Sequence, residues 1–288
     1  ALETAGEKPV TEAQLSQSIE NLLVARNPRN MKTAQAALTP GYYLRAAEYL
    51  RNQTGNIIIG TGFPVTDTFE TDGPVGAIAL YNTLKKLGAA PILACAPPLS
   101  TALAADYQIL ALTADNLESA RIEARDQLAI ITPVAIVCIE RPGLSRDGRY
   151  YNMRGEDIST RCAYFDPFLD QALCPSIAIG DGGNEIGMGN IREAINTLDI
   201  NASVTRCDEL LVADVSNWGA YGLIAFLALW SGENLLGEIA PKEILAYLSA
   251  KGSVDGVTRL NTLTEDGMEA SEGLSIINSL RQLVAEQP

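Results

Sequence analysis

The chain has 288 residues, 47% hydrophobic and 19% charged, proportions that are typical of a globular protein and of neither a disordered nor a membrane chain. Its net charge of −14, from 21 basic and 35 acidic residues, argues against nucleic acid or an anionic membrane as a partner. It contains no histidine. This excludes Ser-His-Asp and Cys-His hydrolases and His-ligated zinc sites, so any proton transfer must use other side chains.

The cysteines and the first ten residues bear on the cellular location of the protein. Five cysteines without CxxC spacing, two of them in apolar strand-like runs, predict reduced and mostly buried thiols. Residues 1–10 have neither an apolar signal core nor an Arg-rich amphipathic pattern. The longest apolar run, 223–230, is too short to cross a bilayer. We therefore predict a cytoplasmic protein with no membrane partner.

The chain begins with helical patterns. Apolar residues at helical spacing predict an amphipathic helix over 11–25, with Thr11 and Gln14 as a capping box. The stretch 26–30 breaks this helix, and its two arginines either face solvent, which we favour, or reach an anion. A second helix is expected at 42–51, which completes an N-terminal helical segment, 1–53.

Strand and helix patterns alternate from there on. Strands are expected at 56–60, 91–95, 107–112, 133–139, 176–179 and 209–213, and helices at 74–87, 99–105, 115–128, 191–198, 220–230 and 268–283. This order predicts an α/β fold, a predominantly parallel, doubly wound sheet with helices on both faces. We expect a single domain over 1–288, with a turn-rich C-terminal excursion at 251–267.

Polar loops follow four of these strands, at 60–74, 140–157, 180–190 and 214–219. The carboxyl ends of parallel strands meet at one edge of a sheet, so the loops should face one another across one crevice. The loop 180–190 alternates five glycines with two carboxylates and two amides and leads into a helical pattern, whose N-terminus would favour an anion. It matches neither the P-loop nor the dinucleotide motif, and no lysine lies in these loops to hold pyridoxal phosphate.

Together the loops resemble the D-glutamate cyclase family. The motifs are Thr61-Gly62-Phe63-Pro64 with Glu70-Thr71-Asp72-Gly73-Pro74, Tyr151-Asn152-Met153-Arg154-Gly155, Gly180-Asp181-Gly182-Gly183-Asn184-Glu185-Ile186-Gly187-Met188-Gly189, and Ser216-Asn217-Trp218-Gly219. The resemblance is to the cyclase portion of longer animal members, with a weaker echo in 255–258 and 266–267. It implies a hydro-lyase that converts D-glutamate to 5-oxo-D-proline and water.

This reaction joins the substrate amine to its own γ-carboxyl carbon, so it needs a base and an acid. Without histidine, Asp181 and Glu185 are our candidates, since their proximity would separate their pKa values. The N–H groups of Gly182 and Gly183 would hold the oxyanion. Arg154 either grips the substrate's α-carboxylate or pairs with Glu156 or Asp157. The candidate substrate-binding residues are Gly62, Asp72, Asn152, Arg154, Gly182, Gly183, Asn184, Ser216 and Asn217.

Some of these residues have a structural alternative. Asp72 either orients the amine or caps the helix that starts at Pro74, and Ser216 and Asn217 either contact substrate or cap the helix that follows them. No cofactor is certain, but Mg²⁺ or Mn²⁺ could bind carboxylates that converge. The candidate metal ligands are Glu70, Asp72, Asp181, Glu185 and Asp214.

Three other functions remain open from the residues alone. The first is a non-catalytic module that binds an acidic amino-acid metabolite in the same crevice. The second is an enzyme for a related small amino dicarboxylate. A nucleotide-dependent transferase would need a phosphate-binding motif that the loops do not contain. We expect a small anionic amino-acid substrate and no nucleic-acid partner, and the sequence is compatible with a homo-oligomer.

Overall fold

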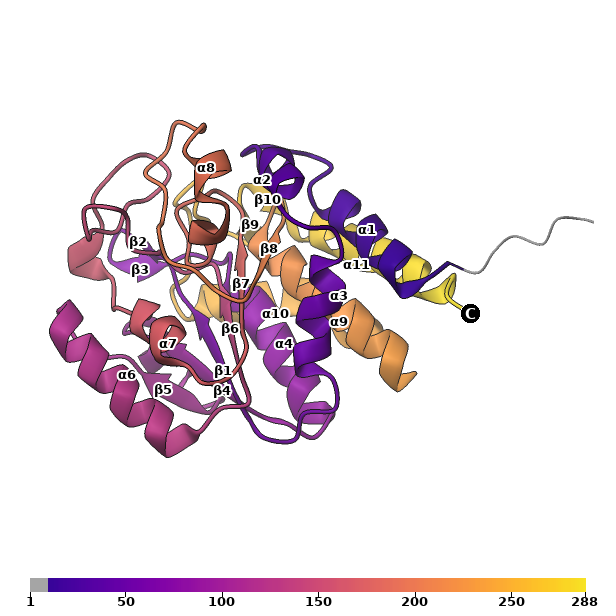
Figure 1. Cartoon of the computed structure of the whole chain (residues 1–288), viewed down its shortest axis with the longest axis horizontal. Helices are drawn as coiled ribbons and strands as arrows, with labels where there is room; N and C mark the ends of the chain where they lie inside the picture. The colour runs from indigo at the N-terminus through magenta and orange to yellow at the C-terminus, as the bar shows by residue number, and fades with distance from the viewer. Residues whose placement is uncertain (1–9) are drawn as a thin grey trace, which may run out of the picture.

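The computed structural model describes residues 10–288, so nearly all of the segment on which we predicted no leader lies outside the described residues. The centre of the fold is one six-stranded parallel sheet in the order β5-β4-β1-β6-β7-β8 (Figure 1). Its strands are β1 (Asn56–Thr61), β4 (Ala90–Cys95), β5 (Ile109–Ala111), β6 (Ala135–Ile139), β7 (Ser176–Gly180) and β8 (Glu209–Val212). The expected α/β class and parallel sheet are confirmed.

The strand order changes direction between β1 and β6. The chain runs from β1 outward through β4 to β5, and then returns to place β6 on the other side of β1. Both central strands are buried apolar segments, as a parallel sheet covered on both faces requires. The connections that leave their carboxyl ends go to opposite faces, and this is where doubly wound sheets bind ligands.

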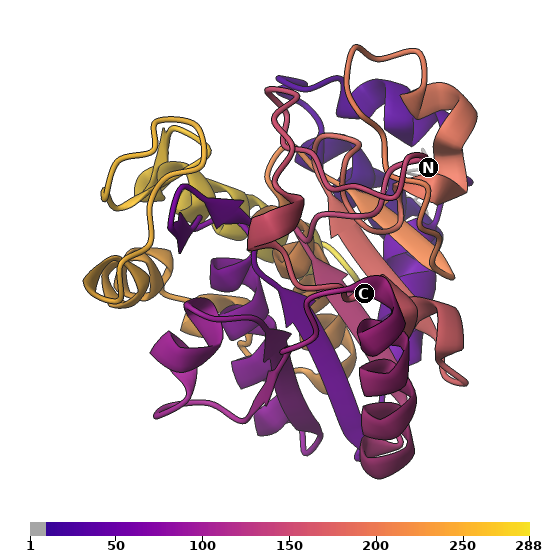
Figure 2. The same cartoon turned by 90° about the vertical axis from the view of Figure 1, so that its left-hand side faces the viewer.

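Helices cover both faces of the sheet (Figures 1 and 2). On one face α4 and α9 pack together and are surrounded by α1, α3, α10 and α11, and α6 packs with α7 on the other. The helices are α1 (Glu12–Leu23), α2 (Met31–Ala37), α3 (Tyr42–Leu50), α4 (Pro74–Lys86), α5 (Leu99–Leu103), α6 (Leu117–Ile131), α7 (Asp166–Gln171), α8 (Arg192–Ile195), α9 (Ser216–Ser231), α10 (Pro241–Ala250) and α11 (Ala270–Ala285).

Short elements complete the chain. Two small hairpins pair β2 (Pro64–Val65) with β3 (Thr68–Phe69), and β9 (Thr264–Glu265) with β10 (Met268–Glu269). The 3₁₀ turns are η1 (Ser159–Arg161), η2 (Met188–Ile191) and η3 (Leu236–Glu238). The first hairpin follows β1 and the second ends the C-terminal excursion, and both contribute to the upper side of the molecule in Figure 1.

Helix α9 is buried over most of its length. Its side chains are buried from Ser216 to Ala228, because its sequence is apolar on all sides. It crosses α4 closely: a Cβ at Gly76 would lie 2.9 Å from the Cα of Asn217, so only glycine fits there. This contact brings the N-termini of α4 and α9 together beside the carboxyl ends of the strands.

The six expected strands form within two residues of their predicted bounds, and the Thr11–Gln14 capping box of α1 is present. Helix α9, however, begins at Ser216 and not near 220, so residues 216–219 form its first turn instead of a loop. The sequence analysis did not predict α2, α7 or α10. One core cluster extends from Leu15 to Leu280, and a single domain remains our proposal. Within residues 10–288, no helix has both the length and the apolar character needed to span a membrane.

Candidate active site

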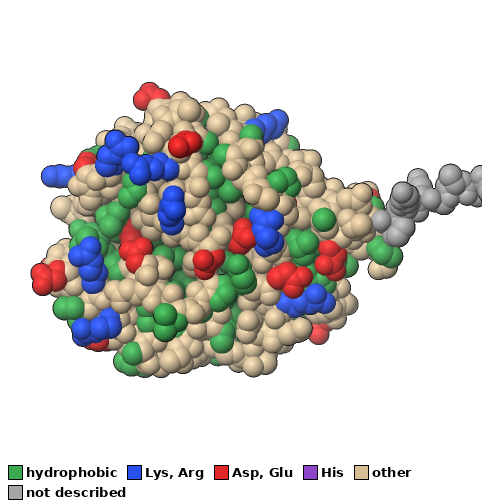
Figure 3. Space-filling model, viewed as in Figure 1, with side chains coloured by type: hydrophobic (Ala, Val, Ile, Leu, Met, Phe, Trp, Pro, Cys, Tyr) green, Lys and Arg blue, Asp and Glu red, His purple; other side chains and the backbone are tan. Residues whose placement is uncertain are grey.

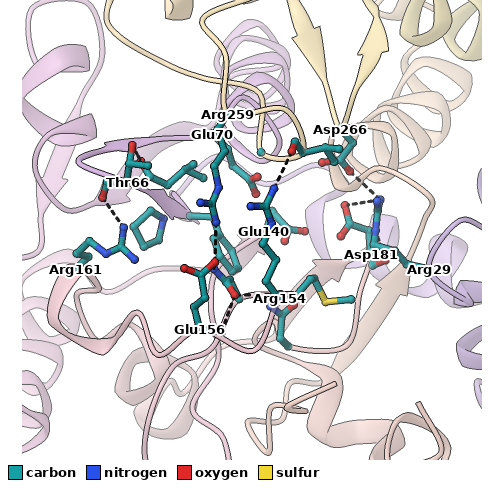
Figure 4. Close-up of a pocket in the computed structure, with 18 residues that line it drawn as sticks. Arg29, Thr66, Glu70, Glu140, Arg154, Glu156, Arg161, Asp181, Arg259 and Asp266 are labelled. Atoms are coloured by element: carbon teal, nitrogen blue, oxygen red, sulfur yellow. Dashed lines mark hydrogen bonds and ion pairs between the residues drawn. The ribbon is translucent and has the colours of Figure 1, made fainter. Parts of the chain in front are cut away.

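A cavity of about 310 Å³ opens at the carboxyl ends of the strands (Figure 4). Its walls come from the β2–β3 hairpin after β1, the segments after β6 and β7, and the C-terminal excursion. Charged side chains dominate the lining: the acids Glu70, Glu140, Glu156, Asp181 and Asp266 and the arginines Arg29, Arg154, Arg161 and Arg259. Three of the four expected loops thus meet at one cavity.

A cluster of buried carboxyl groups forms the floor of this cavity and continues beneath it, since Asp72 and Glu185 belong to the cluster but do not line the cavity. Three groups of three have oxygens that lie within 4.8 Å of one another: Glu70 with Asp72 and Glu140, Asp72 with Asp181 and Asp266, and Glu140 with Asp181 and Glu185. Of the expected metal candidates, the structure brings together Glu70, Asp72, Asp181 and Glu185. Glu140 and Asp266 are additions that sequence reasoning missed.

The carboxyl groups of the floor have different protonation tendencies. Burial raises the pKa of Glu70, Asp72, Glu140 and Asp266 well above the ordinary values, and the charge of Asp181 adds to this effect. Burial acts on Asp181 in the same direction. The nearby Arg29 and hydrogen bonds from Asp72 and Asp266 outweigh it and hold the pKa of Asp181 below its ordinary value. The pKa shifts in the floor therefore run in opposite directions: burial favours the neutral form of Glu70, Asp72, Glu140 and Asp266, and Arg29 favours the ionised form of Asp181.

Arg29 is the cation of this floor. Its guanidinium lies 3.4 Å from Asp181 and 2.8 Å from Asp266, and its Nε donates to the backbone oxygen of Asp181 at 3.1 Å. Its Nη2 also donates to the backbone oxygen of Asp214. The side chain is 19% exposed. Our expectation that Arg29 faces solvent was wrong, because the turn after α1 packs against the loops after β7 and β8.

Glu185 holds the glycine-rich loop from inside. Its carboxylate accepts hydrogen bonds from the backbone N–H groups of Asp181 at 2.5 Å, Gly182 at 3.0 Å and Gly183 at 2.7 Å. It is fully buried and does not line the cavity. The expected oxyanion donors at Gly182 and Gly183 are thus already bonded to Glu185. Burial and the charge of Asp181 raise the pKa of Glu185 to about 7.

The loop also ends differently from the sequence expectation. It continues into the 3₁₀ turn η2 and a four-residue helix, α8, so no long helix presents its N-terminus to an anion here. Asn184 lines the cavity, and its side-chain amide donates to the backbone oxygen of Tyr151 at 2.9 Å. It therefore ties the glycine loop to the 151–157 segment.

Asp72 and Asn217 cap each other's helices. Asp72 accepts hydrogen bonds from the backbone N–H groups of Asn217 at 3.0 Å and Ser216 at 3.4 Å, at the start of α9. In return, Asn217 Oδ1 accepts from the N–H groups of Gly73 and Gly76, each at 2.8 Å, at the start of α4. From the sequence we considered Asp72 as the cap of α4, the helix that follows it in the chain, whereas in the structure it caps α9. The close α4–α9 crossing makes this exchange possible.

Ser216 connects the helix start to the acidic floor. Its hydroxyl donates to Glu140 at 2.5 Å, and its N–H group lies 3.3 Å from Asp181. Ser216 and Asn217 are fully buried. Neither lines the cavity, and Ser216 reaches it through Glu140 and Asp181, which do.

Arg154 is exposed and lies on the rim of the cavity (Figure 4). Its Nη2 donates to the backbone oxygen of Val257 at 3.1 Å. The alternative ion pairs are not formed, because Glu156 pairs with Arg259 at 2.7 Å and Asp157 with Arg149 at 2.7 Å. Asn152, also in the lining, accepts from the Arg154 N–H group at 3.0 Å and holds this turn.

Two expected site residues lie elsewhere. Asp214 faces away from the floor, because its carboxylate accepts the backbone N–H groups of Arg26 at 2.9 Å and Asn27 at 3.0 Å. It joins the turn after α1 to the end of β8 and is not in the carboxylate groups above. Gly62 has a φ of 114° and lines a second cavity, behind the β2–β3 hairpin, instead of the main one.

Positive side chains are unevenly distributed on the surface. On the face seen in Figure 3, Lys and Arg side chains gather mostly on the left-hand half, over the loops around the β2–β3 hairpin. Against a net charge of −14, this concentration gives the entrance a local attraction for anions. Arg161 and Arg259 line the cavity, and no motif in the sequence marks them as site residues.

The fold and site define an α/β protein with a charged cavity at the switch point of a doubly wound sheet. The model of the family described as D-glutamate cyclase-like, C-terminal, matches residues 19–281. The chain belongs to this family.

A curated relative, the human protein "D-glutamate cyclase, mitochondrial", is 33% identical over 199 residues. The match covers 60% of this chain and 32% of the human protein, so the chain spans about a third of that relative. That name refers to mitochondria, and the cytoplasm remains only our prediction for this chain. A solved structure of an exopolyphosphatase-related protein from Bacteroides fragilis has a TM-score of 0.43 at 12% identity, over 86% of this chain and 60% of that one.

Proposed function

We propose that this chain cyclises D-glutamate to 5-oxo-D-proline with loss of water. Family membership supports a cyclase-like lyase. The observation that carries the proposal is that Asp181, paired with Arg29, and the buried Glu70 line one cavity with pKa values shifted in opposite directions. A reaction that removes protons from an amine and delivers them to a carboxyl oxygen needs both forms side by side.

The arginine rim would bind the substrate anion. Arg154 is the candidate partner for the α-carboxylate, because its guanidinium forms no ion pair within residues 10–288. One of its N–H groups donates to the backbone oxygen of Val257, and the other donors remain for a substrate. Arg259 stands beside it on the same rim. A substrate held there and folded on itself would direct its γ-carboxyl toward the acidic floor. Such positioning is a large part of the catalysis of a ring closure.

The proton transfers must balance. The ammonium nitrogen loses two protons, the bond from nitrogen to the γ-carbon forms, and one γ-oxygen leaves with both protons as water. Asp181 is the base in this scheme, since Arg29 keeps it ionised. We assign the acid to Glu70, which lines the cavity and whose carboxyl group forms no hydrogen bond with the described residues. Glu185, our first candidate for a partner of Asp181, would instead shape the loop that carries this base.

The same floor suits a divalent cation. Its donors are carboxylate oxygens, the ligands that Mg²⁺ and Mn²⁺ prefer. Asp72, Asp181 and Asp266 would hold such an ion, with Glu70 and Glu140 as the alternative partners of Asp72. A bound ion would polarise the γ-carboxyl of the substrate.

The test is an assay of primary-amine loss with purified protein and D- or L-glutamate, with and without a chelator. We expect turnover of D-glutamate, and a loss of about 10²–10⁴-fold in Asp181→Asn, the usual effect of removing a positioned proton-transfer group. Glu118→Gln, on the exposed face of α6, is the matched control and should keep full activity. Binding of glutamate without turnover would favour a non-catalytic module, and turnover of another amino dicarboxylate would correct the substrate.

A further inference from the structure

A second cavity, of about 170 Å³, lies behind the β2–β3 hairpin. Its lining shares Phe63, Pro64, Thr66 and Arg161 with the main cavity, so the hairpin is the wall between the two. The remaining lining comes from the segments after β1, β4 and β6 and from the residues around Cys162. None of the carboxyl groups of the acidic floor belongs to it.

Arg141 lines this cavity and is 3% exposed. Its Nη1 donates to the backbone oxygen of Thr61 at 3.3 Å and its Nη2 to that of Ala163 at 2.7 Å. A guanidinium carries five N–H donors, so three of them remain after these two bonds. Its Nε is buried without a hydrogen-bond partner in the described part of the chain.

The positive charge of Arg141 is not neutralised by these contacts. Across residues 10–288, the ion pairs include none between Arg141 and a carboxylate. The guanidinium contacts the ring of Phe165, whose centroid lies 5.6 Å from Cζ, and two carbonyl oxygens. None of these groups carries a negative charge, so the net charge of Arg141 is unchanged. A buried cation without a counter-charge is costly, so the missing partner is informative.

The nearby acids do not supply that partner. Asp166 is buried and forms no ion pair with Arg141; its oxygens accept from Tyr150 at 2.5 Å, from the Leu144 N–H at 3.0 Å and from Thr205 at 2.5 Å. Asp67, the acid in the cavity lining, is exposed at the turn of the hairpin. Glu140, next to Arg141 in the chain, turns to the main cavity and binds Ser216.

We propose that this cavity binds a small carboxylate anion, with Arg141 as its counter-ion. The rest of the lining favours a carboxylate with a short apolar body, because the walls are rich in proline, phenylalanine and leucine and offer few other donors. These apolar residues are Phe63, Pro64, Phe69, Pro97, Pro98 and Leu99. Arg161 is a second cation at the edge shared with the main cavity, and its Nη1 donates to the Thr66 carbonyl at 2.6 Å. This site does not depend on the proposed cyclisation.

The test is an NMR titration of the full chain with propionate, propionamide and inorganic phosphate. Propionamide has the shape of propionate without its charge. We expect propionate to bind at least about tenfold more tightly than propionamide, the loss expected for a charged hydrogen bond. Ala96→Leu, which adds side-chain volume to the cavity lining and leaves Arg141 in the chain, should weaken propionate binding at least about tenfold, and so should Arg141→Met. Arg154→Ala, which changes only the main cavity, should leave this affinity within about twofold.

Each other outcome contradicts the proposal. Equal affinity for propionate and propionamide would show that Arg141 is not the counter-ion. Binding that survives Ala96→Leu and is lost in Arg154→Ala would place the anion in the main cavity. Phosphate that binds more tightly than propionate would replace the carboxylate with an inorganic anion. If Arg141→Met does not fold, Ala96→Leu and the amide analogue still decide the question.

Discussion

Replacing Arg29 by methionine tests the electrostatic account of the floor. The change removes the guanidinium that lies 3.4 Å from Asp181 and 2.8 Å from Asp266 and leaves two carboxyl groups that are 7% and 8% exposed without a cation. Breaking a buried ion pair by removing one partner costs about 3–5 kcal/mol. Because this pair is little exposed, solvent screening reduces the figure only slightly, and we expect this loss in the free energy of unfolding at pH 8.

The loss should depend on pH in a defined direction. In the wild type the pKa of Asp181 is lowered, so its contribution is present at neutral pH and is lost as pH falls through the folded-state pKa. In Arg29→Met burial acts without Arg29, so the pKa of Asp181 should rise and its ionisation should oppose folding. The stability gap between the two proteins should therefore be smaller at pH 5 than at pH 8.

Urea unfolding followed by circular dichroism, at pH 5 and pH 8, measures this gap. Arg26→Met is the matched control: its ion pair with Glu272 is 39% and 43% exposed, and its guanidinium lies 5.0 Å from the Trp218 ring, so its loss should cost about 1 kcal/mol. An Arg29→Met protein that loses no more than the control at pH 8 would refute the reasoning. So would a gap of the same size at both pH values.

Three further predictions use the same unfolding measurement. Glu185→Gln should lose about 2–3 kcal/mol, because the amide keeps one acceptor oxygen for three N–H groups, and an unchanged stability would mean that the loop does not depend on them. Asn217→Ala leaves the N–H groups of Gly73 and Gly76 without their acceptor and should also cost about 2–3 kcal/mol. As a control, Ser231→Ala at the other end of α9 should change stability by less than about 0.5 kcal/mol. Burial raises the pKa of Glu265 from 4.5 to about 7. Between pH 4.5 and pH 7 the free energy of unfolding of the wild type should therefore fall by roughly 3 kcal/mol relative to that of Glu265→Gln, at about 1.4 kcal/mol per pH unit. Parallel pH profiles of the two proteins would contradict this.

Much of the fold was determined by local sequence. The six strands are β-branched and apolar runs, and the helices between them follow apolar spacing, so their order already predicted the parallel sheet. The rule that ligands bind at the carboxyl ends of parallel strands then selected the loops that carry Glu70 and Asp181. The motifs in these loops also indicated the family, and the family match confirms it. These inferences succeeded because each depends on a short stretch or on the order of stretches.

The partners within the site were decided only by tertiary structure. Arg29 and Asp181 are separated by 152 positions, and only the packing of the turn after α1 brings them together. The caps formed by Asp72 and Asn217, 145 positions apart, depend on the close crossing of α4 and α9. The orientation of Glu185 into its own loop is likewise invisible in its spacing from Asp181. Sequence patterns report which face of an element is buried, whereas the direction of a polar side chain depends on what the rest of the chain places beside it.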